Sequence, residues 1–114
     1  MSKIYKTKDE IINQKFESKK FSEINGRILR NLNILNDKKP KLNAFVTLFS
    51  DIDFNEFSEC INFLSLCRYI KLSNVSTSRE TPFDIKEFDN ITVKLTARGI
   101  KLLKGKKQDK AVDI

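Results

Sequence analysis

The spacing of apolar residues changes once along this 114-residue chain, after Arg68, and the change decides its fold class. Before Arg68, apolar residues recur every three or four positions, as they do along the buried face of an amphipathic helix. After it, residues 69–75 and 91–95 alternate between apolar and polar side chains, which is typical of half-buried strands. The order predicts a single domain of the α+β class, mainly helical, with two strands towards its C-terminal end.

Apolar spacing and capping residues predict five helices, at residues 8–19, 21–35, 42–49, 54–66 and 97–104. The clearest has one apolar face, made of Phe21, Ile24, Ile28, Leu32 and Leu35. Gly26 lies inside this helix and weakens the prediction. Asp53 and Glu56 form a capping box for the fourth helix, and Thr96 and Gly105 are expected to begin and end the fifth. We expect a polar loop at residues 76–90 and a loose polar tail at residues 106–114.

Composition removes most catalytic and metal-binding possibilities. The chain has no histidine, the usual general base and commonest zinc ligand, and its three glycines form no phosphate-binding loop. On one helix, Cys60 and Cys67 would be separated by about 10.5 Å of rise, beyond the ~7 Å reach of a disulfide. We therefore expect reduced thiols, no metal or cofactor, no enzymatic activity, and a cytoplasmic location without a secretory signal or membrane span.

Charge is segregated along the chain, whose formal net charge is +7. Residues 1–41 carry 11 Lys or Arg and 5 acids, for a net +6. Residues 42–90 carry 4 and 8, for a net −4, and residues 91–114 carry 7 and 2, for a net +5. Two basic ends favour nucleic acid or another anionic surface as a partner. A solvated lysine surface without a partner is the alternative.

The sequence resembles the winged helix-turn-helix family over about residues 21–105. Residues 57–70, FSECINFLSLCRYI, look like the second helix of the helix-turn-helix unit leading into the first wing strand. Residues 91–103, ITVKLTARGIKLL, look like the second wing strand and the helix after it. The resemblance implies a DNA-binding module, although winged helices also serve as protein-docking modules. Residues 1–20 would then be an added N-terminal helix and possible dimerisation arm, and residues 106–114 a basic tail.

The resemblance makes residues 54–66 the helix that normally enters the major groove. This helix contains no Lys or Arg. Asp53, Glu56 and Glu59 would face the phosphates, which is electrostatically unfavourable. We expect its exposed positions to be Asn55, Glu56, Ser58, Glu59, Asn62 and Ser65. The helix is therefore expected to face solvent or another protein.

The wing is the better candidate for binding DNA. Arg79 at its tip would suit the narrow minor groove of AT-rich double-stranded DNA. Lys38, Lys39 and Lys41 precede the helix at residue 42 and could hold a phosphate at its N-terminus. The expected nucleic-acid-binding residues are Lys41, Lys71, Ser76, Thr77, Ser78, Arg79, Lys86, Lys94 and Arg98. A mobile polar loop with no partner is the alternative.

An acidic helix, a basic wing and an added N-terminal helix together resemble the TcpK-type relaxosome accessory proteins of Gram-positive conjugative plasmids. Plasmid-partition proteins of the TubR type and phage proteins of the YjcQ type are similar to nearly the same degree. The resemblance implies a plasmid or mobile-element protein that marks a transfer site, with a relaxase or another protein as a further partner. Plasmid partition, transcription regulation and protein docking through the acidic helix are alternatives.

A homodimer is expected because the first helix has a short apolar stripe that needs a partner. The dimer contact would be made by Ile11, Ile12 and Phe16. The stripe could equally fold back onto the core of its own chain.

Overall fold

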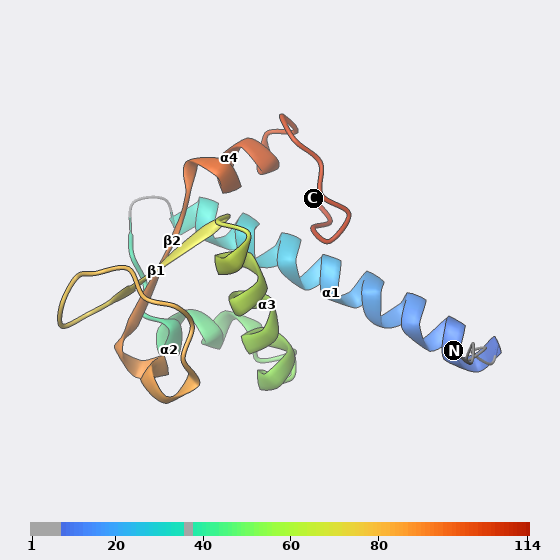
Figure 1. Ribbon diagram of the computed structural model, residues 1–114, viewed down its shortest axis with the longest axis horizontal. Coiled ribbons are helices and arrows are strands. Elements are labelled where there is room, and N and C mark those ends of the chain that lie inside the picture. Colours follow the sequence, from blue (N-terminus) through green and yellow to red (C-terminus); the bar gives the residue numbers. More distant parts are fainter. Residues whose placement is uncertain (1–7, 36–37) are drawn as a thin grey trace, which may run out of the picture.

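The computed structural model describes the backbone of residues 8–35 and 38–114 and the side chains of residues 18–35 and 38–114. Its elements are α1 (Lys8–Leu35), α2 (Leu42–Phe45), the 3-10 helix η1 (Val46–Phe49), α3 (Phe54–Leu66), β1 (Ile70–Asn74), the 3-10 helix η2 (Ile85–Asn90), β2 (Ile91–Leu95) and α4 (Ala97–Leu103). The two strands form an antiparallel hairpin (Figure 1). The predicted α+β, mainly helical class is confirmed.

α1 is one helix of 28 residues, where the sequence predicted two, at residues 8–19 and 21–35. No glycine or proline lies between residues 8 and 25 to interrupt it. The Ser22 hydroxyl also donates a hydrogen bond to the Lys19 carbonyl, 2.8 Å away, across the expected break. Among the described side chains of α1, the buried ones begin at Ser22, and the N-terminal part of the helix projects away from the body (Figure 1).

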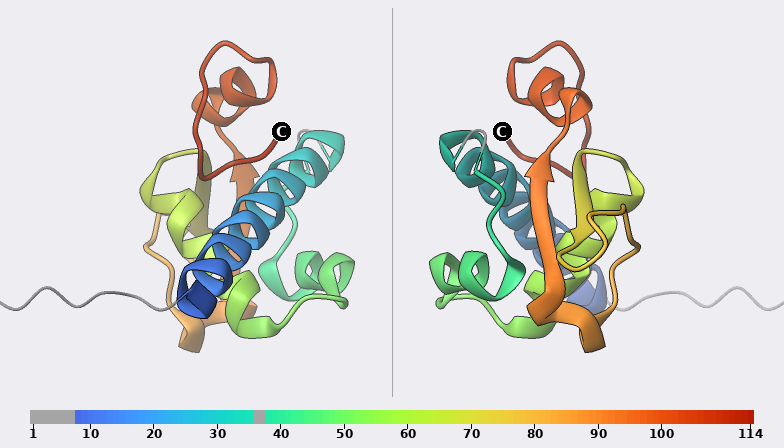
Figure 2. Two further views of the ribbon diagram at one scale, coloured as in Figure 1. Left: turned by 90° about the vertical axis from the view of Figure 1, so that its right-hand side faces the viewer. Right: turned by 90° about the vertical axis from the view of Figure 1, so that its left-hand side faces the viewer.

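The core forms where α1 crosses the inner face of the hairpin. Figure 2 shows this from opposite sides: α1 lies in front of the hairpin in one view and behind it in the other. The α1 residues Ile28, Leu29 and Leu32 are at most 2% exposed. They pack in one cluster with the inward-facing strand residues Ile70, Leu72, Ile91, Val93 and Leu95. The alternation in the sequence therefore identified the inner face of the sheet correctly.

Three phenylalanines join the short helices to α3. The ring centroids of Phe45 and Phe49 are 5.1 Å apart, and those of Phe49 and Phe57 are 5.2 Å apart. The turn between η1 and α3 is held to α1 by Arg27, which donates to both carboxylate oxygens of Asp51 at 2.8 and 2.9 Å. The Arg27 guanidinium also lies 4.9 Å from the centre of the Phe49 ring. These contacts fix the position of the N-terminus of α3, where Asp53 accepts from the backbone of the first turn as predicted.

Residues 106–114 form a strap along α1, where the sequence predicted a loose tail. The Asn25 side-chain amide donates to the Ala111 carbonyl at 2.9 Å, and the Asp113 amide donates to the Ser22 carbonyl at 3.0 Å. Val112 is 5% exposed and belongs to the core cluster. A third hydrogen bond runs from the Arg30 guanidinium to the Asp113 carbonyl at 3.0 Å. One buried valine and three hydrogen bonds to α1 dock this segment, which we call the C-terminal strap.

Gly26 lets the C-terminal strap approach α1 closely. A Cβ atom at this position would overlap the backbone carbonyl of Asp113. A glycine inside a helix costs roughly 1 kcal/mol relative to alanine, and here the missing side chain makes room for another backbone segment. The same residue that weakened the prediction of this helix therefore marks a close contact.

We expect Gly26→Ala to lower the free energy of unfolding by about 1–3 kcal/mol, because displacing the strap exposes Val112 and breaks its hydrogen bonds to α1. Urea denaturation measures this loss, and faster amide exchange at Asp113 locates it. Glu23→Ala, an exposed change on the same helix, is the control and should be nearly neutral. An ordinary stabilising effect of Gly26→Ala, as at an open helical position, would contradict this role.

Candidate nucleic-acid interface

The outer face of the β1–β2 hairpin gathers three of the predicted lysines. Lys71 and Lys94 are directly opposite each other in the strand register, and both are exposed. Lys41 pairs with Thr92 in an isolated antiparallel bridge, so its side chain lies on the same side of the sheet as that of Thr92. We call this surface the outer hairpin face; it comprises Lys41, Lys71, Ser73, Thr92 and Lys94.

A shallow hollow opens on the outer hairpin face. Its lining residues are Lys39, Lys71, Ser73, Asn74, Val75, Ser78, Thr92 and Lys94. This set contains three lysines and three hydroxyl side chains, and no carboxylate. Glu80 is the bridge partner of Ser73 on the other edge of β1, so its side chain lies on the same side of the sheet, although it does not line the hollow. Lys39 was expected to help hold a phosphate at the N-terminus of the helix at residue 42. It was not predicted to lie beside the lysines of the hairpin.

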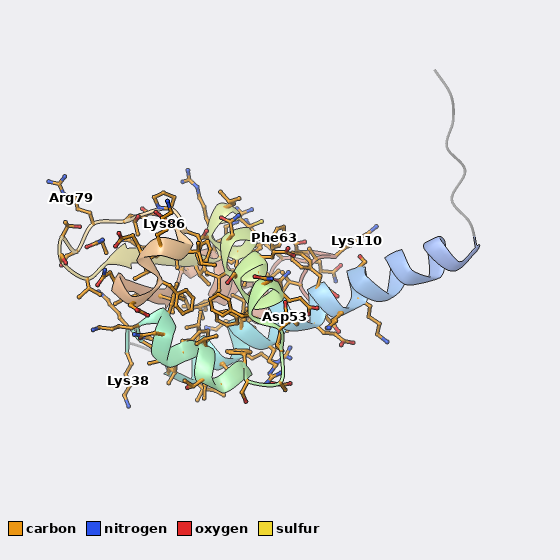
Figure 3. All side chains as sticks on the ribbon, turned by 90° about the horizontal axis from the view of Figure 1, so that it is seen from below. Lys38, Asp53, Phe63, Arg79, Lys86 and Lys110 are labelled. Atoms are coloured by element: carbon orange, nitrogen blue, oxygen red, sulfur yellow. The ribbon has the colours of Figure 1, made fainter. Side chains whose placement is uncertain are left out.

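The tip of the hairpin is an ordered turn organised by Asn74. Its side-chain oxygen accepts from the amides of Ser76 and Thr77 at 2.8 and 3.2 Å. Its backbone amide donates to the Arg79 carbonyl, and its carbonyl accepts from the Ser78 amide, both at 2.8 Å. Ser78 adopts the left-handed conformation with a φ of 59°. The turn therefore presents Arg79 from a defined backbone, at the end of the hairpin that points away from the body (Figure 3).

The rest of the predicted polar loop at residues 76–90 is also structured. The Asp84 carboxylate caps the 3-10 helix η2 by accepting from the Lys86 amide at 3.0 Å. The ring of Phe88 meets that of Phe54 at the start of α3, with centroids 5.1 Å apart. These contacts tie the loop to α3. These contacts could not be predicted from the sequence, because single aromatic residues in a polar segment have no periodicity.

Two of the predicted site residues lie apart from the hollow. Lys86 belongs to η2, and in Figure 3 it lies towards the opposite side of the molecule from Lys38. Arg98 belongs to α4, and its guanidinium lies 5.4 Å from the centre of the Tyr69 ring. The structure therefore brings together Lys41, Lys71, Ser78 and Lys94, and places Ser76, Thr77 and Arg79 on the adjoining tip.

α2 has four residues, so the expected phosphate site at its N-terminus is not supported by a helix of sufficient length. The Lys41 carbonyl accepts from the amides of Ala44 and Phe45 at 3.1 and 2.9 Å, which closes this single turn. Lys39 and Lys41 belong instead to the hollow and to the outer hairpin face. The side chains of Ile11, Ile12 and Phe16, the predicted dimer contact, lie outside the described residues.

α3 presents a different surface from the hairpin. Ser58 was expected to be exposed but is 6% exposed, because the buried face of α3 is wide and includes Phe57, Ser58, Cys60, Ile61 and Leu64. Glu56 is half-buried and pairs with Lys20 at 3.0 Å. The remaining solvent-facing stripe consists of Asn55, Glu59, Asn62 and Leu66, and the Leu66 side chain is 73% exposed. We call it the α3 stripe; it carries no cation.

The buried groups of the core titrate at high pH. Tyr69 is 5% exposed and donates to the Asp109 carboxylate at 2.6 Å. Burial, followed by this hydrogen bond and the negative charge of Asp109, raises the pKa of Tyr69 to about 12. Burial, assisted by Glu59 and Glu56, raises the pKa of the Cys60 thiol to about 12. Cys60 and Cys67 are both free thiols, as predicted.

Comparison with protein families, curated proteins and solved structures finds no match to this chain. Within residues 8–35 and 38–114, no helix has the length and apolar character needed to cross a membrane. Among the described side chains, those of residues 18–35 and 38–114, no three His, Cys, Asp or Glu come together as metal ligands could.

We expect the free energy of unfolding to fall as the pH rises from about 10 to about 12, because Tyr69 ionises at pH 10 when unfolded and near 12 when folded. The stabilisation is complete below pH 10. Urea denaturation across this range should show a shallower pH dependence for Tyr69→Phe, which retains only the contribution of Cys60 and other groups. Equal pH dependence in the two proteins would contradict the assignment.

Proposed function

We propose that this chain is a non-enzymatic winged helix-turn-helix protein that binds double-stranded DNA through its hairpin and acts in the cytoplasm. The outer hairpin face carries this proposal, since three lysines share one face of a sheet beside a hollow without carboxylates. DNA carries one negative charge per ~1.7 Å of its axis, so such a surface gains from releasing counterions. The absence of histidine from the sequence supports binding over catalysis.

The order and pairing of the elements support the winged-helix assignment. α2 and η1 are followed by a tight turn and α3, and β1 and β2 then form the hairpin. A bridge between Lys41 and Thr92, with the Val93 amide donating to the Pro40 carbonyl at 2.9 Å, adds a short third segment to the sheet before α2. This arrangement supports the proposal that α2 to α3 is a helix-turn-helix unit and that the adjoining hairpin is its wing.

The ordered tip supports a preference for AT-rich DNA. Arg79 is exposed on a turn whose backbone is fixed by Asn74, so less conformational entropy is lost on binding. A guanidinium held this way fits the narrow, strongly negative minor groove of A-tracts. The lysines of the outer hairpin face would then lie against the backbone beside that groove.

A second candidate function, protein docking, is favoured by the α3 stripe. Leu66 is an apolar residue of this stripe that is 73% exposed, and Glu59 lies on the same stripe. A partner of this surface would offer an apolar contact and a cation. Under the DNA-binding proposal the α3 stripe stays free for such a partner, and a relaxase is the partner suggested by the resemblance.

We propose the biological role from the resemblance, and the DNA sequence that the protein binds would distinguish this role from its alternatives. We propose an accessory protein for conjugative transfer of a plasmid or other mobile element. Plasmid partition and transcription regulation are the alternatives. Recovering bound fragments from the DNA of the source cell separates them, since a transfer origin, a partition site and a promoter are different loci.

We also propose a homodimer formed through the projecting part of α1. The described buried residues of this helix begin at Ser22, and the N-terminal part of its backbone projects away from the body (Figure 1). Light scattering on Ile12→Glu/Phe16→Glu should then give the monomer mass, with the wild type at twice that value. A wild-type monomer at micromolar concentration would contradict this arrangement.

We expect fluorescence anisotropy with a 20-bp AT-rich duplex to give a log–log salt slope of about −5, corresponding to about six phosphates. Arg79→Ala should weaken binding to this duplex by about 1–3 kcal/mol and reduce the preference over a GC-rich duplex. Glu59→Gln, which removes a charge from the α3 stripe, should leave binding unchanged or tighter. Failure to bind either duplex at 50 mM salt would overturn DNA binding.

A further inference from the structure

Lys71 and Lys94 form a like-charge pair that the fold itself does not need. Side chains directly opposite on an antiparallel hairpin have Cβ atoms about 4.5–5.5 Å apart, and like charges at such positions are destabilising. Neither lysine pairs with a carboxylate among the described residues, whose ion pairs are Lys20–Glu56 and Arg27–Asp51. A bound anion would turn this repulsion into attraction.

The third lysine of the hollow is held beside this pair by backbone contacts. Lys39 precedes Pro40, whose carbonyl accepts from the Val93 amide at 2.9 Å. Lys41 is then bridged to Thr92. The backbone carrying Lys39 is thereby fixed to β2, next to the strand position of Lys94.

Hydroxyl groups complete the surroundings of the hollow, whose volume is about 320 Å³. The Thr92 hydroxyl makes a 3.3 Å hydrogen bond to the Ser73 carbonyl, a long contact that an incoming acceptor can replace. Ser73 and Ser78 add two further hydroxyls at the rim. Three ammonium groups and several O–H donors around one open hollow match an anion with several acceptor oxygens.

We infer that Lys39, Lys71 and Lys94 form a discrete binding site for a phosphate group on the outer hairpin face. The inference rests on the proposed function and deepens it: the phosphate is that of the DNA backbone, bound by the sheet, separately from the contact of the tip with the groove. An acidic peptide offers carboxylates, but it lacks the regular charge density of a duplex.

The first test uses inorganic pyrophosphate and no DNA. Titration into the wild-type protein should give saturable amide shifts in the NMR spectrum, concentrated at residues 71–74 and 92–94. Lys71→Gln/Lys94→Gln should abolish them. The matched control is Lys101→Gln/Lys104→Gln on and just after α4, which removes the same charge from exposed positions outside the hollow. Unsaturable shifts at all lysines, or equal loss in the control, would overturn the site.

The second test separates a backbone phosphate from a free one. With the AT-rich duplex, Lys71→Gln/Lys94→Gln should reduce the magnitude of the salt slope by about 2, and Lys39→Gln by about 1, while the preference for AT-rich DNA remains. An unchanged slope in a protein that still binds DNA would overturn the inference and leave the proposed function standing. Pyrophosphate binding without DNA binding would overturn the proposed function and, with it, the assignment of the bound phosphate to the DNA backbone. Tighter binding of a poly-glutamate peptide than of the duplex would assign the site to a protein partner and overturn it.

The third test distinguishes a binding role from a structural one. Because the two lysines repel each other, Lys94→Gln should raise the melting temperature of the free protein while weakening pyrophosphate binding. A lysine retained for stability would lower the melting temperature when replaced. A binding role predicts a higher melting temperature together with weaker pyrophosphate binding, whereas a structural role predicts a lower melting temperature. The two roles therefore remain distinguishable even if the variant changes the fold slightly.

Discussion

The buried face of α1 supports every other element of this protein. From Ser22 onward it contacts α3, α4 and β2, and its backbone and side chains hold the C-terminal strap. A two-stranded hairpin alone is marginally stable in water, so the outer hairpin face exists only because the inner face lies on α1 and α3. The position of the lysines therefore depends on apolar contacts made on the other side of the same strands.

Much of this fold follows from local patterns in the sequence. The helical spacing of α1 and α3, the strand alternation, and the caps at Asp53 and Thr96 all depend on residues within one or two turns of each other. The C-terminal strap does not, because Asn25 and Ala111 are 86 positions apart. The end of α3 at Leu66 was predicted correctly from the change of apolar spacing after Arg68, although no glycine marks it. Arg68 takes the left-handed position, with a φ of 63°, that glycine usually occupies and that Gly105 does occupy after α4.

The candidate site was predictable only in part, for a similar reason. Alternation places Lys71 and Lys94 on the polar face of their strands without any structure. That they are opposite each other depends on strand register, and the arrival of Lys39 depends on the bridge between Lys41 and Thr92. The loop between β1 and β2 is too long to determine the strand register, and it does not determine the bridge between Lys41 and Thr92. The ordering of the tip by Asn74 could have been suspected, since asparagine commonly accepts from the amides two and three residues ahead.

The distribution of carboxylates explains why the acidic middle of the chain does not cancel the basic hairpin. Residues 42–90 have a net charge of −4, and four of their eight acids are occupied elsewhere. Asp53 and Asp84 cap helices, and Asp51 and Glu56 pair with cations of α1. Coulomb interactions between exposed groups decay within a Debye length of about 8 Å at physiological ionic strength. The local field at the outer hairpin face is therefore set by its lysines and by Glu80, the bridge partner of Ser73, and not by the more distant acids. Sequence charge, averaged over the segment, understates how positive this surface is, and only the fold separates the two signs.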